Sequence, residues 1–123
     1  MFEISTEVSF SAAHRLRNYD GPCENLHGHN WRVRAFVRSE RLNDVGIAID
    51  FKTLRERLSD VVAPLDHSDI NILFEAEGLN PSSENLARYI FKRLQSRLRE
   101  SGCSVRRVEV FETPASCAAY FEP

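Results

Sequence analysis

The chain has 123 residues, of which 42% are hydrophobic and 28% are charged, as is typical of one globular domain. The formal net charge of −2 shows no basic excess, so we expect no nucleic-acid partner. The sequence lacks an apolar run of about 18 residues and a basic signal-peptide region at its N-terminus. We therefore expect a cytoplasmic protein with no membrane span, folded as a single domain over residues 1–123.

Residues 2–14 alternate between apolar and polar side chains, which predicts a half-buried β-strand. The apolar face of this strand ends at His14. A histidine in that position either caps the core or faces inward as a ligand.

Residues 27–39 alternate in the same way and predict a second strand. His27 and His29 are two positions apart, so both side chains point to the same face of that strand. The connecting residues 15–26 are rich in turn formers. A hairpin brings same-face side chains within about 5 Å of each other, which would place His14 beside the other two histidines.

Three imidazoles suit Zn²⁺, which in catalytic sites takes three protein ligands and keeps one position open. There the metal acts as a Lewis acid on a substrate oxygen. Cys23 lies four residues before His27 and has two possible uses. Its thiol either removes a substrate proton beside the metal, or closes the site as the fourth ligand of a structural zinc.

Helical spacing of apolar residues predicts a helix over roughly residues 51–63, with Asp50 as its N-cap. A second helix is predicted to begin at Ser82 or Ser83 and to end near Gly102. Both helices carry an apolar stripe, so both are expected to pack on the same sheet.

Residues 65–81 lie between these helices and are expected to form a polar loop of about seventeen residues. Asp66 directly precedes His67 within that segment. Either the carboxylate fixes the tautomer of the imidazole and raises its pKa for a proton relay, or the aspartates cap backbone N–H groups in a turn.

Residues 105–113 predict a third strand and residues 117–121 a fourth. Glu112 follows Val108 and Val110 on one face of the third strand. A carboxylate on an inward face needs a basic partner or a ligand with donors, because burying a lone charge is costly. The order β-β-α-α-β-β predicts an α+β domain with a four-stranded antiparallel sheet and two helices on one face.

Five motifs follow one another along the chain. They are Phe10-Ser11-Ala12-Ala13-His14, Cys23-x-x-x-His27-Gly28-His29, Leu65-Asp66-His67-x-x-x-Asn71, Pro81-x-Ser83-Glu84-Asn85 and Phe111-Glu112-Thr113. In this set the chain resembles the 6-pyruvoyl-tetrahydropterin synthase family. The resemblance implies the tunnelling fold, in which subunits form an oligomeric barrel as trimers or hexamers with active sites at the subunit interfaces.

The resemblance also implies the roles of individual residues. It implies that zinc is held by His14, His27 and His29. It implies catalytic roles for Cys23 as proton acceptor, for Asp66 and His67 as a relay, and for Glu112 as the group that anchors the pterin. Ser83 belongs to the same motif set and is expected to contact the substrate.

Three residues separate Cys23 from His27, and this spacing resembles the bacterial 6-carboxy-tetrahydropterin synthases of queuosine biosynthesis. The expected enzyme is thus a lyase that converts 7,8-dihydroneopterin triphosphate and releases acetaldehyde and triphosphate. Three alternatives stay open at this point. They are a pyruvoyl-forming enzyme that only eliminates triphosphate, a non-catalytic pterin-binding protein stapled by zinc, and an assembly module.

Overall fold

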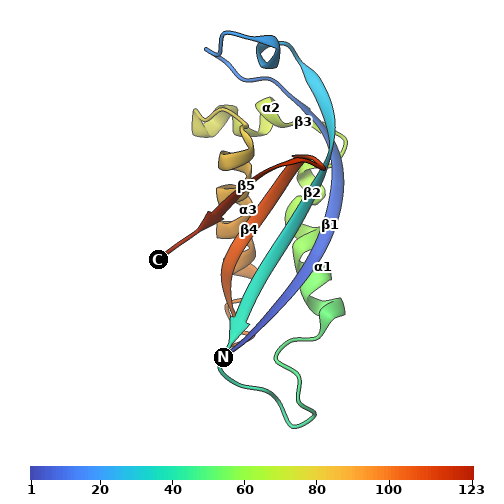
Figure 1. The fold of residues 1–123 in the computed structure, drawn as a ribbon, viewed down its shortest axis with the longest axis vertical. Coiled ribbons are helices and arrows are strands. Elements are labelled where there is room, and N and C mark those ends of the chain that lie inside the picture. The colour runs from blue at the N-terminus through green and yellow to red at the C-terminus, as the bar shows by residue number, and fades with distance from the viewer.

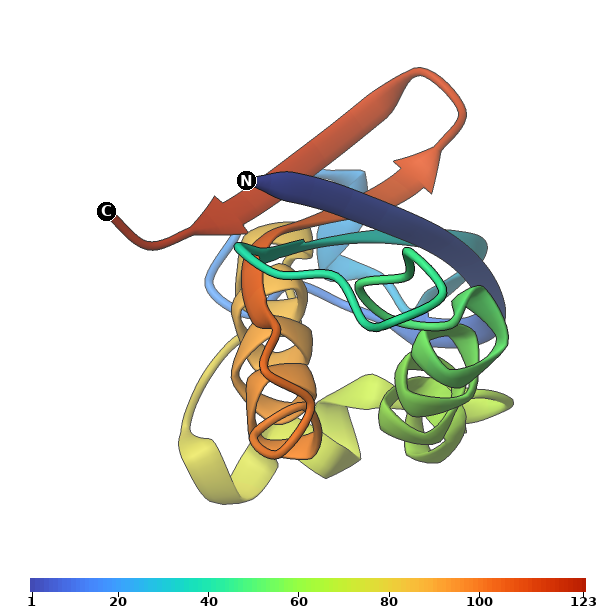
Figure 2. The same ribbon diagram turned by 90° about the horizontal axis from the view of Figure 1, so that it is seen from below.

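The computed structural model describes residues 1–123, apart from the side chain of Cys23. Two long helices lie against one face of a twisted sheet (Figures 1 and 2). The elements in chain order are β1 (Phe2–His14), η1 (Pro22–Glu24), β2 (His27–Ser39), α1 (Phe51–Val62), η2 (Ala63–Leu65), β3 (Ser68–Asp69), α2 (Ile70–Phe74), η3 (Glu75–Glu77), α3 (Ser83–Arg97), β4 (Ser104–Thr113) and β5 (Ser116–Phe121).

The sheet has five strands in the order β3-β1-β2-β4-β5. Every neighbouring pair is antiparallel except β1 and β3, which run parallel with Ala12 opposite Ser68. The prediction of four antiparallel strands was therefore wrong, because Ser68 and Asp69 add a short strand at the edge of β1. A two-residue strand has no alternating pattern that a sequence could reveal.

The segment 65–81 is not the polar loop that the sequence predicted. It contains β3, then α2, then the short η3 turn. The Asp69 carboxylate caps α2 by accepting a hydrogen bond of 3.0 Å from the backbone N–H of Asn71. Ile70 and Phe74, four residues apart, are fully buried and hold this short helix against the rest of the fold. The described chain thus has three α-helices in place of the predicted two.

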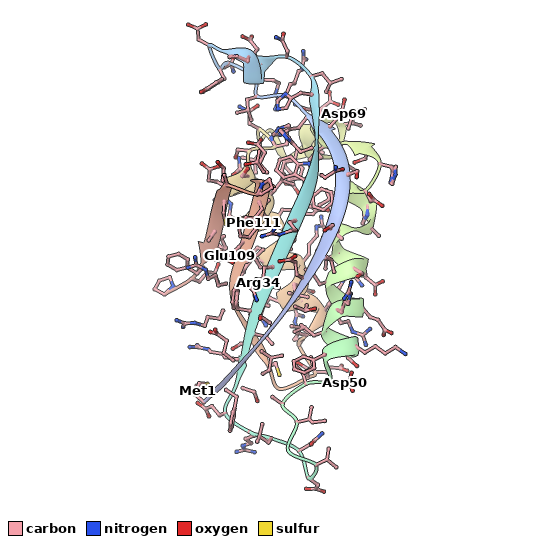
Figure 3. All side chains as sticks on the ribbon, turned by 45° about the vertical axis from the view of Figure 1, so that its right-hand side comes forward. Met1, Arg34, Asp50, Asp69, Glu109 and Phe111 are labelled. Carbon is pink, nitrogen blue, oxygen red and sulfur yellow. The ribbon has the colours of Figure 1, made fainter. Side chains whose placement is uncertain are left out.

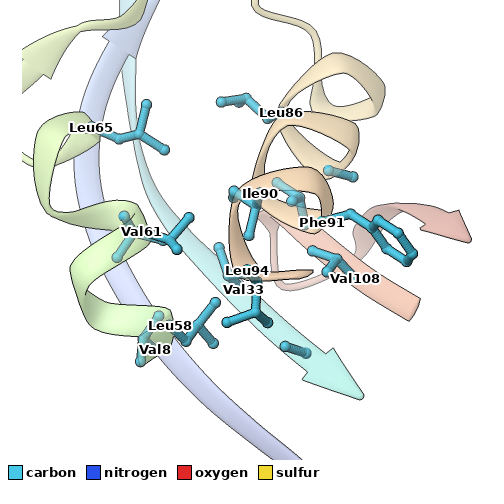
Figure 4. Close-up of a cluster of buried hydrophobic side chains, with 14 of the residues drawn as sticks. Val8, Val33, Leu58, Val61, Leu65, Leu86, Ile90, Phe91, Leu94 and Val108 are labelled. Atoms are coloured by element: carbon cyan, nitrogen blue, oxygen red, sulfur yellow. The ribbon is translucent and has the colours of Figure 1, made fainter. Parts of the chain in front are cut away.

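The two long helices begin where the sequence predicted. Asp50 caps α1 by accepting from the N–H of Lys52 at 2.8 Å, and Ser82 caps α3 by accepting from the N–H of Asn85 at 3.1 Å. Their apolar stripes meet the sheet and form one core (Figure 4). The labelled core residues are Val8, Val33, Leu58, Val61, Leu65, Leu86, Ile90, Phe91, Leu94 and Val108.

In the described chain, no helix covers the other face of the sheet (Figure 2). Charged and aromatic side chains lie on that face, among them the labelled Arg34, Glu109 and Phe111 (Figure 3). Arg34 on β2 lies opposite Glu109 on β4, and Phe111 lies opposite Arg32. An antiparallel sheet covered on one side only is expected to alternate in this way. Among the described residues, no helix is long and apolar enough to span a membrane.

Candidate metal centre

The hairpin of β1 and β2 brings the three histidines together, as the sequence predicted. The two strands pair without interruption, so that His14 lies opposite His27 and Ala12 lies opposite His29. All three side chains share the helix-covered face of the sheet. The ring centroid of His14 lies 4.6 Å from that of His27 and 5.2 Å from that of His29. The geometry follows from the two-residue period of a strand.

Backbone carbonyls fix the orientation of two of the rings. The Nδ1–H of His14 is placed to donate to the carbonyl of Pro81 at 2.7 Å, and that of His27 to the carbonyl of Asn25 at 2.6 Å. A neutral histidine that donates from Nδ1 keeps a lone pair on Nε2. Metal-binding histidines commonly use this arrangement, because the second hydrogen bond holds the ring and raises its basicity.

Glu112 joins the histidines from β4. Its Oε1 lies 3.1 Å from Nε2 of His14 and 3.2 Å from Nε2 of His29. One ligand atom from each of these residues and from His27 falls within 4.8 Å of the others. Glu112 follows Phe111, labelled in Figure 3, so its side chain points to the opposite face of β4 from that ring.

Nε2 of His14 and Nε2 of His29 are buried and have no hydrogen-bond partner among the described residues. Two buried imidazole nitrogens and a carboxylate oxygen therefore lie against one another, an arrangement that is favourable when a proton or a cation lies between them. Neutral imidazoles with a carboxylate suit Zn²⁺ and similar divalent metals. The donor set thus fits the metal that the sequence predicted.

Burial lowers the pKa of His29 below its ordinary value of 6.5. Glu112 opposes this effect by raising the pKa, whereas His14 and His27 lower it further by repelling the imidazolium. The balance keeps the ring neutral near pH 7, which is the form that binds a metal.

Trp31 packs against the cluster from β2 and is fully buried. Its ring lies 4.9 Å from that of His14 and 5.1 Å from that of His29, and it has no exposed surface. Its Nε1–H donates to the carbonyl of Ala12 at 3.2 Å. Because Trp31 shares the face of His27 and His29 on β2, its place next to them follows from the same alternation.

Asp66 and His67 pair with each other but do not join the cluster within this chain. The Asp66 carboxylate lies 3.0 Å from Nδ1 of His67 and accepts the backbone N–H of Ser11 at 2.9 Å. Ser11 belongs to the face of β1 opposite to His14. The His67 side chain is 82% exposed. The hydrogen bond from the Ser11 N–H is the main reason that the pKa of Asp66 is lowered, with His67 adding to it.

His67 also adopts a left-handed backbone conformation, with φ of 55°. This region costs a non-glycine residue about 1–2 kcal/mol, although histidine tolerates it better than most. The N–H of His67 donates to the carbonyl of Ser11 at 2.6 Å, which helps to hold that conformation. The pair is thus fixed at the edge of β1 while its imidazole faces outward.

The remaining site predictions have different outcomes. The prediction for Cys23 concerns a side chain outside the described part of the structure. Ser83 is the first residue of α3 and lies two residues after Pro81, whose carbonyl holds His14. The motif Pro81-x-Ser83-Glu84-Asn85 thus marks the segment that positions a metal ligand, and Asn85 tethers that segment by donating to the carbonyl of Asn80 at 2.8 Å.

Comparison with known proteins places these features in a wider context. A family profile described as 6-pyruvoyl tetrahydropterin synthase matches residues 3–123. The 6-carboxy-5,6,7,8-tetrahydropterin synthase of Synechocystis is 40% identical over an alignment that covers all of this chain and 95% of that protein. The protein of the same name from Haemophilus influenzae is 31% identical over an alignment that covers 99% of this chain and all of that protein.

A solved structure has the same fold. The 6-pyruvoyl tetrahydropterin synthase of Caenorhabditis elegans superposes with a TM-score of 0.85 at 28% sequence identity, over 99% of this chain and 96% of that one. The likeness extends along the whole chain, in agreement with the order of the motifs.

Proposed function

The chain belongs to the 6-pyruvoyl tetrahydropterin synthase family, and from this premise we propose that it is a zinc-dependent 6-carboxy-5,6,7,8-tetrahydropterin synthase. The substrate is 7,8-dihydroneopterin triphosphate, and the released fragments are acetaldehyde and triphosphate. The product would feed queuosine biosynthesis. The observation that carries the proposal is the convergence of two unpartnered imidazole nitrogens, His27 and Glu112 on one point.

The metal would be held by His14, His27 and His29, and it would polarise the hydroxyl or carbonyl oxygen of the substrate side chain. Its three ligands come from two paired strands, which hold them more firmly than a loop would. Cys23 is placed by sequence four residues before His27 and would accept a substrate proton. A positioned base of this kind contributes a factor of roughly 10²–10⁴ to the rate.

Glu112 would bind the pterin ring. A carboxylate accepts two N–H donors from the guanidine-like edge of a pterin, and such charge-assisted bonds are the strong ones. Glu112 is about one-third exposed, at 30%, so a ligand can reach it from outside the chain. Ser83 is partly buried at the start of α3 and would contribute a hydroxyl to the same pocket.

Asp66 and His67 are proposed to act on a neighbouring subunit. Within one chain they contact the backbone of Ser11, at the edge of β1 opposite to the edge that pairs with β2. Their exposed imidazole can instead complete the site of another copy. We therefore propose a homo-oligomer, a trimer or a hexamer of single-domain chains, whose active sites lie between subunits.

The pyruvoyl-forming reaction is the second candidate, because the C. elegans structure with the same fold carries that name. The 6-carboxy outcome is preferred on the name of the more similar Synechocystis relative and on the three-residue spacing between Cys23 and His27. Both reactions release triphosphate, so triphosphate alone does not separate them.

The test is to incubate zinc-loaded protein with 7,8-dihydroneopterin triphosphate and to assay the products. Acetaldehyde together with a 6-carboxy pterin supports the proposal, whereas a pyruvoyl pterin without acetaldehyde supports the second candidate. Cys23→Ala supplies the control. It should keep zinc and fold but lose turnover, and loss of zinc together with unfolding would favour the zinc-stapled binding protein.

A further inference from the structure

A cavity of about 540 Å³ is lined in part by the 15–26 connection. That connection lies at one end of the molecule (Figure 1). Its volume falls within the range of roughly 300–1,000 Å³ that is usual for small-molecule sites. It is lined by Arg15, Arg17, Asn18, Glu24, Gly78 and Asn80. Of these residues only Asn80 was placed in the site described above, as the acceptor that tethers the segment holding His14.

Three of the lining residues are covalent neighbours of groups in the histidine cluster. Arg15 follows His14 directly. Asn80 precedes Pro81, whose carbonyl accepts from His14, and Glu24 precedes Asn25, whose carbonyl accepts from His27. The cavity lining therefore comes within one residue of the two carbonyls that orient His14 and His27.

The charges of the lining favour an anion. Two arginines face one carboxylate, Glu24, which leaves a net positive cavity. A second cavity of about 300 Å³ shares Arg15 and Arg17 but also contains Asp69 and Glu75, so its charges balance. The charge of the lining thus favours a negatively charged group in the first cavity over the second.

Arg17 is held in place before any ligand arrives. Its backbone N–H and its Nε–H donate to Oδ1 of Asn80 at 3.0 and 3.3 Å, and its Nη2 donates to the carbonyl of Leu79 at 3.2 Å. Asn80 donates back to the carbonyl of Arg17 at 2.9 Å. A guanidinium has five N–H donors, so this one keeps donors for a ligand and loses little entropy on binding it.

Arg15 is anchored only through its backbone. Its N–H donates to Oδ1 of Asn71 at 2.8 Å, and its carbonyl accepts from Nδ2 of Asn71 at 2.9 Å. The residue is exposed and lines the cavity. The guanidinium can therefore follow a flexible ligand while the backbone beside His14 stays fixed.

We propose that this cavity binds the polyphosphate chain of the substrate, with Arg15 and Arg17 pairing to phosphate oxygens and Glu24 limiting the affinity so that the released polyphosphate can leave. The assignment rests on the proposed function, which supplies a substrate with a triphosphate tail. Arginine suits this task because its planar group binds phosphate oxygens in pairs.

The experiment compares the binding of neopterin triphosphate and of neopterin, two unreactive probes that differ only in the phosphates, to zinc-loaded protein by calorimetry. The ratio of the two affinities measures the phosphate contribution. Wild-type protein should bind neopterin triphosphate at least about tenfold more tightly. Arg15→Gln should lower that ratio about tenfold, the loss of one charge-assisted hydrogen bond, with neopterin affinity unchanged within twofold.

Two further variants sharpen the comparison. Glu24→Gln should raise the ratio, because it removes the carboxylate that repels phosphate. Arg57→Ala is the matched control, since Arg57 is exposed on α1, away from the cavity lining, and should leave the ratio unchanged. Zinc content is measured after each titration, because polyphosphates chelate zinc.

A wild-type protein with no preference for neopterin triphosphate overturns the proposal, and so does an unchanged ratio in Arg15→Gln. These failures are distinct from a failure of the proposed function. If dihydroneopterin triphosphate is turned over while Arg15→Gln leaves the affinity ratio unchanged, the proposed function is supported and the phosphate site is refuted. If turnover is absent while Arg15→Gln lowers the ratio, the phosphate site stands and the function falls.

Discussion

Replacing Glu112 by glutamine separates the two tasks that its position allows. The carboxylate lies 3.1 Å from Nε2 of His14 and 3.2 Å from Nε2 of His29, so it can act as a fourth metal ligand. It is also 30% exposed, so it can act as the anchor of the pterin ring. Glutamine keeps the size of the side chain and one acceptor oxygen, but it removes the charge.

The expected magnitude follows from the number of hydrogen bonds. A carboxylate that accepts two pterin N–H groups loses about one charge-assisted bond on becoming an amide, which is worth roughly 1.5–3 kcal/mol. Since about 1.4 kcal/mol corresponds to a factor of ten, Glu112→Gln should weaken pterin binding by about 10- to 150-fold. Zinc affinity should fall by about 10- to 100-fold, as for other groups that neighbour a metal ligand.

The assay is neopterin binding at saturating zinc, after one zinc per chain has been verified by elemental analysis. Glu109→Gln is the matched control, because Glu109 lies on the same strand but on the opposite face, where it accepts from Arg107 at 3.0 Å. It should bind zinc and neopterin as the wild type does.

A zinc-saturated Glu112→Gln protein that binds neopterin with wild-type affinity would refute this reasoning. Glu112 would then close the metal site and would not anchor the substrate. The open coordination position, and with it the proposed catalytic reaction, would lose its support.

Three other predictions follow from the site. Cobalt should quench the fluorescence of Trp31, the single tryptophan of the chain, in proportion to site occupancy, because its ring lies within 5.1 Å of two ligand rings; a titration without quenching would contradict the geometry. Metal-free protein should lose stability as the pH falls below 6.5, since the lowered pKa of His29 means that the unfolded chain binds the extra proton first. The urea midpoint of metal-free protein should then fall less between pH 7.5 and pH 5 in His29→Gln than in the wild type, and an equal fall in both would argue against His29 as the cause. Mixing inactive Cys23→Ala with inactive His67→Ala should restore part of the activity if each site combines residues from two chains, whereas a mixture that stays inactive would place the complete site in one chain.

The hairpin and its histidines were predictable because one physical rule governs both. Alternation fixes which face each side chain takes, and it assigned His14, His27 and His29 to the buried face. The uninterrupted pairing of β1 with β2 then brings the three rings together. The inward face of Glu112 was predicted by the same rule, and its carboxylate lies against two of those histidines.

The segment 65–81 was not predictable in the same way. β3 has two residues and α2 has five, which is too short for either period to be recognised. Their stability comes from tertiary contacts, such as the burial of Ile70 and Phe74. A usable signal was Asp69 directly before Ile70, which is the pattern of an N-cap followed by a buried helical face.

The carbonyls that orient the histidines were missed for a different reason. Pro81 and Asn25 act through backbone oxygen atoms, and a backbone acceptor has no residue type that marks it in a sequence. The placement of Asp66 and His67 at the edge of β1 also depends on β3, so it was hidden together with that strand. The assignment of Cys23 as a base still rests on the sequence.

X-ray absorption at the zinc edge of the zinc-loaded chain tests most directly whether three imidazoles hold one metal and leave a position for the substrate. We expect a shell of nitrogen and oxygen ligands at about 2.0–2.1 Å with imidazole scattering from three rings, and a change in that shell when neopterin is added. A sulfur ligand at about 2.3 Å, with no response to neopterin, would show that Cys23 closes the site and would contradict the account.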